Sequence, residues 1–107
     1  MTVGSFYFRL TTSGNLLGEF SNNGSTENST ESAERKIPAG NSFVGEFYAS
    51  WQEDGKAFYA DLEITPKTQT ANMFTLTWMR DNKQVFWGQG FLAEGLLIGN
   101  YQDQPIP

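Results

Sequence analysis

The chain has 107 residues, the size of one domain, and a formal net charge of −5. It contains neither cysteine nor histidine, the side chains on which many catalytic and metal sites depend. The missing residues exclude disulfides, thiolate or imidazole metal ligands and a Ser–His–Asp triad. We therefore expect a chain that is not an enzyme and that uses no cofactor. Its seven basic residues are scattered, so we expect neither nucleic acid nor a membrane as a partner.

The first third of the chain predicts two strands and a polar segment. Residues 6–10 and 16–22 alternate apolar and polar side chains, and the turn at 13–15 joins them. The polar segment 22–34 is interpreted as a mobile loop or a weak edge strand, and it could lie as a lid over the mouth of a barrel. A solvated loop is the more usual role for such a segment. A possible further strand lies near 31–37.

The rest of the chain repeats the same alternation in short runs. Asp54-Gly55 stands between two of them and is a strong signal for a tight hairpin. No window has the periodicity of a helix. Five strands are predicted here, over 43–51, 58–64, 74–79, 85–92 and 96–101.

Seven strands and a possible eighth, joined by short turns, predict antiparallel pairing between neighbours in the sequence. We predict one all-β domain over residues 1–107, an antiparallel up-and-down meander that closes into an eight-stranded barrel. An open β-sandwich is the alternative.

A short pattern, apolar-x-Gly-x-aromatic, occurs at 16–20, 43–47 and 97–101. The glycine and the aromatic residue are two positions apart and therefore share one face of a strand. Such a glycine either lets a neighbouring ring lean across a strongly curved strand or leaves space for a ligand. The first interpretation is favoured, because small barrels need this spacing to close.

Three segments resemble avidin-like and calycin barrels. Gly4-Ser5-Phe6 is similar to the Gly-x-Trp that opens many of those chains, with Phe6 in place of tryptophan. Leu16-Leu17-Gly18-Glu19-Phe20 and Leu76-Thr77-Trp78 are similar to later strands of that group. The resemblance implies an up-and-down barrel with one end open to a small ligand. It does not carry over a full set of polar residues for biotin.

Inward-facing aromatic residues with a polar group are the first candidates for a ligand site, because such a group needs a partner when it is buried. Trp51, Trp78 and Tyr101 have this character, and we add Phe47 and Asn22 to the predicted site. The alternative is that these side chains simply fill the core. Tyr101 is the one titratable residue on the predicted inward faces, which argues against an enzyme.

The run 85–92 is apolar on both faces. If one face lies in the core, Val85, Trp87 and Phe91 form an exposed apolar stripe, and such stripes often mark an interface. We therefore predict a homo-oligomer that uses these three residues.

The sequence leaves three functions open, and an enzyme without metal or cofactor, such as an isomerase or cyclase housed in the barrel, is the least favoured of them. Of the other two, the first is non-catalytic binding of a small, largely apolar or aromatic ligand inside the barrel. The alternative is a protein–protein interaction or structural module with a filled core that acts through its outer surface. The amino terminus, residues 1–4, has no features of a signal peptide, so we expect a cytoplasmic protein, or a mature secreted form whose signal has been removed.

Overall fold

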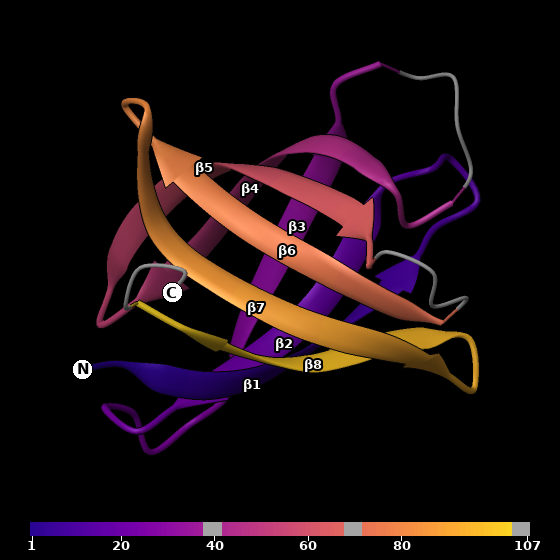
Figure 1. Cartoon of the computed structure of the whole chain (residues 1–107). Coiled ribbons are helices and arrows are strands. Elements are labelled where there is room, and N and C mark those ends of the chain that lie inside the picture. The colour runs from indigo at the N-terminus through magenta and orange to yellow at the C-terminus, as the bar shows by residue number, and fades with distance from the viewer. Residues whose placement is uncertain (38–41, 68–71, 104–107) are drawn as a thin grey trace.

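In the computed structural model, which describes residues 1–37, 42–67 and 72–103, eight antiparallel strands form a closed barrel (Figure 1). Each strand pairs with the next one along the chain, and β1 pairs with β8 to close the sheet. This confirms the predicted all-β meander and excludes the open sandwich. The strands are β1 (Val3–Leu10), β2 (Leu16–Asn22), β3 (Ser29–Arg35), β4 (Gly45–Glu53), β5 (Lys56–Pro66), β6 (Met73–Arg80), β7 (Lys83–Ala93) and β8 (Leu96–Gln102).

Strand β3 corrects the prediction for the polar segment 22–34. Residues 29–34 are neither a loop nor an edge strand nor a lid, because they lie in the barrel wall and pair with both β2 and β4. The strand signal near 31–37 was correct, although β3 begins and ends two residues earlier. The sequence hid β3 because its buried positions, Glu31 and Ala33, include no large apolar residue.

The two ends of the barrel differ. Strand β1 begins and β8 ends at one end of the barrel, where Thr2 and Asp103 exchange hydrogen bonds (Figure 1). We call this the terminal end. At the opposite end, Arg35 donates hydrogen bonds to the carbonyl oxygens of Gly14, Val44 and Ser42, and so covers the interior there.

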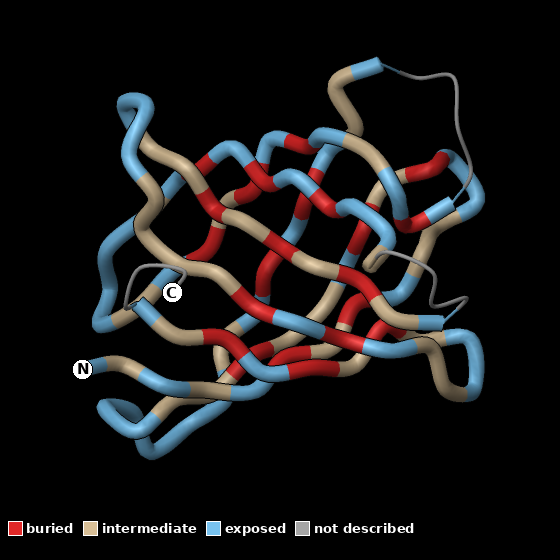
Figure 2. The backbone as a smooth tube through the Cα atoms, viewed as in Figure 1, coloured by how far each residue is buried: buried red, intermediate tan, exposed pale blue. Residues whose placement is uncertain are grey.

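Side chains alternate between the interior and the solvent along most strands, as the colours of Figure 2 show. Full burial of each large aliphatic or aromatic side chain stabilises the fold by about 1.5–3 kcal/mol. The largest fully buried side chains are Phe8, Phe47, Leu16, Leu62, Ile64, Leu76 and Leu97.

Among the described residues, no helix is long and apolar enough to span a membrane.

Two inward glycines let aromatic rings lie directly against a neighbouring strand. A Cβ atom at Gly18 would stand 1.9 Å from the carbonyl oxygen of Tyr7 and 3.0 Å from the Phe8 ring. A Cβ atom at Gly4 would stand 2.5 Å from the ring of Tyr101. Neither position has room for a side chain, which agrees with the packing interpretation of the glycine pattern at 16–20.

Candidate functional site

The interior near the terminal end holds a small cavity between aromatic rings and two carboxyl groups. Its volume is about 20 Å³, close to what one water molecule needs. A ligand larger than this would have to displace side chains at the rim, where Phe58 and Phe86 are only partly buried. The cavity is lined by Phe6, Phe20, Glu31, Trp51, Glu53, Trp78, Phe86 and Tyr101.

Glu31 is the buried carboxyl group of this cavity. It points inward from β3, between Gly18 of β2 and Trp51 of β4, and only 7 % of it is exposed. Its Oε2 accepts a hydrogen bond of 2.9 Å from the indole Nε1 of Trp78. Among the described residues no hydrogen bond reaches its other oxygen, Oε1, and this oxygen is not one of the fully buried polar atoms.

Burial raises the pKa of Glu31 from 4.5 to about 8, because the charged form loses its hydration. The hydrogen bond from Trp78 acts in the other direction, since it favours the carboxylate. The charge of Glu53 raises the pKa further. Glu31 is therefore mostly protonated and neutral at pH 7, and a positive charge in the cavity would favour its ionisation.

A hydrogen-bonded set of side chains forms the polar part of the rim. Glu53 accepts hydrogen bonds from Nε1 of Trp51 at 3.1 Å and from Nδ2 of Asn22 at 3.3 Å. The same nitrogen of Asn22 also donates to the hydroxyl of Tyr101 at 3.1 Å. Burial raises the pKa of Tyr101 to about 12, and the bond from Asn22 opposes this. Glu53 is thus held in place by two donors from different strands.

Four aromatic rings enclose this part of the interior. Phe20, Trp51, Phe86 and Tyr101 contact one another with centroids 5.4–6.5 Å apart, mostly edge to face. In such contacts one ring presents its edge to the face of the next, a favourable arrangement of ring quadrupoles. Phe58 extends the group by stacking on Trp51 at 6.0 Å. The faces and edges of these rings give the site a largely apolar wall.

The structure brings together four of the five predicted ligand-binding residues. Trp51, Trp78, Tyr101 and Asn22 all lie at the terminal end and share the contacts described above. Phe47 does not join them, because it is fully buried on β4 beneath Arg35, whose guanidinium carbon lies 4.6 Å from its ring centre. Whether any of the five contacts a ligand stays a prediction.

Glu31 was not predicted as a site residue. The prediction that Tyr101 is the one inward titratable group is wrong, because Glu31 and Glu53 also line the cavity. The sequence contains one signal for Glu31: this residue and Ala33 are two residues apart in a segment long enough for a strand, so they share one face. An alternation of small and charged residues does not stand out as a buried face.

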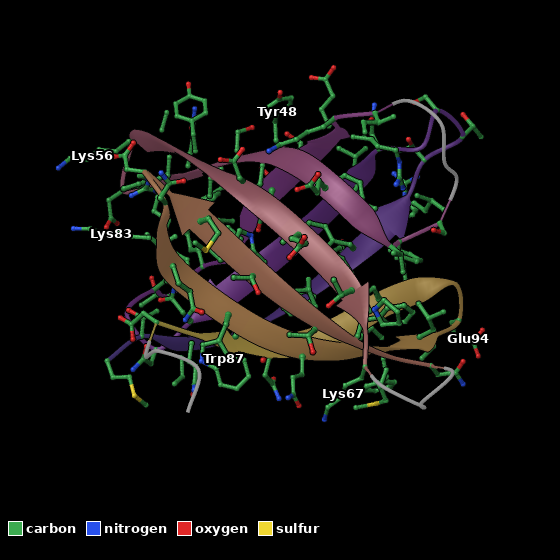
Figure 3. All side chains as sticks on the ribbon, turned by 45° about the horizontal axis from the view of Figure 1, so that its top comes forward. Tyr48, Lys56, Lys67, Lys83, Trp87 and Glu94 are labelled. Carbon is green, nitrogen blue, oxygen red and sulfur yellow. The ribbon has the colours of Figure 1, made fainter. Side chains whose placement is uncertain are left out.

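On β7 the predicted stripe is divided. A bulge lies where Trp78 pairs with Phe86 but Met79 pairs with Gln84, so that Val85 is the extra residue and packs against the core. Phe91 is 46 % exposed, and Trp87 is half-buried on the outside of the barrel, as Figure 3 shows. Among the described residues, Nε1 of Trp87 is the one buried side-chain nitrogen or oxygen without a partner. An interface at this strand stays a prediction.

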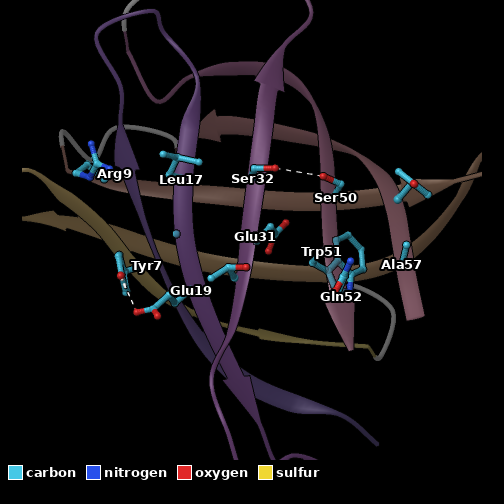
Figure 4. Close-up of a pocket in the computed structure, with 13 residues that line it drawn as sticks. Tyr7, Arg9, Leu17, Glu19, Glu31, Ser32, Ser50, Trp51, Gln52 and Ala57 are labelled. Atoms are coloured by element: carbon cyan, nitrogen blue, oxygen red, sulfur yellow. Dashed lines mark hydrogen bonds between the residues drawn. The ribbon is translucent and has the colours of Figure 1, made fainter. Parts of the chain in front are cut away.

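The outer surface carries a groove along β3. It has a volume of about 700 Å³, and the small side chains of Ser32 and Ser50 form part of its floor (Figure 4). Leu17 and Tyr59 stand on either side of these serines in the same row of the sheet. Tyr59 is 66 % exposed. The groove therefore offers hydroxyl groups between two exposed apolar surfaces.

Within residues 1–37, 42–67 and 72–103, no group of three or more acidic side chains is placed to hold a metal ion. Comparison of the chain with protein-family models, curated proteins and solved structures finds no match. The resemblance to avidin-like and calycin barrels therefore remains a prediction beyond the barrel fold itself.

Proposed function

We propose that the chain is a non-catalytic binding protein that takes a small, largely apolar or aromatic ligand at the terminal end of its barrel. The observation that carries this proposal is the cavity there, with aromatic walls and an unpartnered carboxyl oxygen on Glu31. Ligand sites commonly combine apolar walls with a few fixed polar groups of this kind. The opposite end, covered by Arg35, offers no comparable arrangement among the described residues.

Entry of a ligand requires movement at the rim. The cavity of about 20 Å³ is water-sized, so the ring of a bound ligand has to take the space that Phe86 or Phe58 occupies. Both rings are partly buried and pack at the edge of the aromatic group.

The three tryptophans allow a direct test by NMR. Trp51 and Trp78 belong to the terminal end, whereas Trp87 lies on the outside and serves as an internal control. We expect 2-phenylethanol to shift the indole N–H signals of Trp51 and Trp78 in a saturable way and to leave that of Trp87 unchanged. Shifts confined to Trp87, or no shift at millimolar concentration, would contradict the proposal.

The alternative is an interaction module that acts through the outer surface. It is supported by the groove along β3, by the exposed Tyr48 and Tyr59 beside it, and by Phe91 on β7. A homo-oligomer that buries Trp87 and Phe91 belongs to this alternative. Sedimentation velocity at micromolar concentration tests the homo-oligomer: an oligomer that Phe91→Ser dissociates supports it, and a monomer contradicts it.

A further inference from the structure

The cavity at the terminal end has the chemistry of a site for a positively charged group. Its described lining includes two carboxyl groups, Glu31 and Glu53, and no basic side chain. The other lining residues are aromatic, and ring faces attract cations through their quadrupoles. A neutral apolar ligand would use the rings but would leave Oε1 of Glu31 without a partner.

The size of the cavity restricts the kind of cation. About 20 Å³ is enough for a group as large as a water molecule. A primary ammonium group has about this size and carries three hydrogen-bond donors, whereas a trimethylammonium group is much larger and has none. The cavity therefore fits the former.

We propose that the ligand is a small aromatic primary amine, whose ammonium group occupies the cavity and donates to Oε1 of Glu31, while its ring lies among Trp51, Phe86 and Tyr101. This inference rests on the proposed function and names the class of its ligand. The ring of such an amine replaces part of the contact that Phe86 makes with Trp51 and Tyr101 at 6.2 and 5.4 Å.

Ammonium binding couples to the protonation of Glu31. The titratable groups that line the same cavity are Glu53 on β4 and Tyr101 on β8. At the rim, Arg80 of β6 donates to the backbone of Tyr59 and lies 5.9 Å from the Phe58 ring. Because burial raises the pKa of Glu31 to about 8, an ammonium ion bound at pH 7 displaces the carboxyl proton into solution.

Calorimetry with three related probes tests the inference. At pH 8 we expect 2-phenylethylamine to bind about ten-fold more tightly than 2-phenylethanol, because a hydrogen bond between charged partners is roughly twice as strong as a neutral one. The N,N,N-trimethyl derivative should bind no better than the alcohol. Titration at pH 7 in buffers of different ionisation enthalpy should show release of a proton from the wild-type protein on amine binding.

Two variants assign the effect to Glu31. Glu31→Gln keeps an oxygen that accepts from Trp78 but removes the charge, so the amine should lose its advantage over the alcohol. Glu63→Gln changes an exposed carboxyl group on β5 and should keep that advantage. If Glu31→Gln does not fold, the proton release by the wild-type protein still decides the matter.

The outcomes separate the two proposals. Equal binding of amine and alcohol, binding of the amine without proton release, or binding of the trimethyl derivative as tightly as the primary amine would overturn the inference. In each of these cases the proposed function stands when 2-phenylethanol itself binds in the same titrations. If neither the amine nor the alcohol binds at millimolar concentration, both proposals fail.

Discussion

Replacement of Glu31 by glutamine should change how stability depends on pH. In the folded protein burial raises the pKa of Glu31 from 4.5 to about 8, so the protonated form is the one that stabilises the fold. Stability from this group is fully present below the unfolded pKa and is lost as the pH rises towards the folded pKa. Glutamine does not titrate, and it can still accept the hydrogen bond from Trp78.

The size of the effect follows from the pKa difference. Each pKa unit corresponds to about 1.36 kcal/mol, so a rise from 4.5 to about 8 corresponds to a loss on the order of 5 kcal/mol. Small domains have a total free energy of unfolding of about 5–15 kcal/mol. The ionisation of Glu31 would therefore remove a large part of the stability of this barrel at alkaline pH.

Urea unfolding of wild type and Glu31→Gln from about pH 5 to pH 8 measures this difference. We expect the free energy of unfolding of the variant to rise relative to that of the wild type by about 1.4 kcal/mol per pH unit across the middle of this range. The other carboxyl groups titrate in both proteins, so their contribution largely cancels in the difference. If the free energies of unfolding of the two proteins change with pH in parallel, the reasoning is refuted. Glu31 would then have the same pKa in the folded and the unfolded chain.

Three further changes test the packing and the rim. Tyr101→Phe removes the hydroxyl that accepts from Asn22 at 3.1 Å, and urea unfolding should show a loss of about 1 kcal/mol; no loss would mean that this bond contributes nothing. Gly18→Ala places a Cβ atom 1.9 Å from a backbone oxygen, and thermal unfolding should show a loss of at least about 3 kcal/mol in stability. Gly55→Ala, in open space at φ +76°, is the control and should lose about 1 kcal/mol. Equal losses would contradict the close packing at Gly18. If the chain is an oligomer through β7, Phe91→Ser should lower its sedimentation coefficient, and an unchanged oligomer would place the interface elsewhere.

The barrel could be predicted from the sequence because most strands alternate apolar and polar residues and short turns join them. The alternation of Phe58, Ala60 and Leu62 appears in the structure as buried and half-buried positions on β5. The closure of the barrel depends on β3, and the residues of β3 carry only a weak strand pattern. That strand faces inward with Glu31 and Ala33, because large rings from neighbouring strands fill the space beside it.

The candidate site could be predicted only in part for the same reason. Trp51, Trp78 and Tyr101 stand out as inward aromatic residues, and the structure places them at one end of the interior. Glu31 gave no such signal, because its buried partner is the indole of Trp78, which is distant in the sequence. The bulge that turns Val85 towards the core likewise depends on pairing with β6 and leaves no local mark.

A crystal structure of the protein grown with 2-phenylethylamine tests the central claim most directly. We predict electron density for the amine at the terminal end, with its nitrogen beside Oε1 of Glu31 and the Phe86 ring rotated from its position in the free protein. Unchanged side chains around the cavity, with the amine bound only in the outer groove along β3 or absent at saturating concentration, would contradict the account.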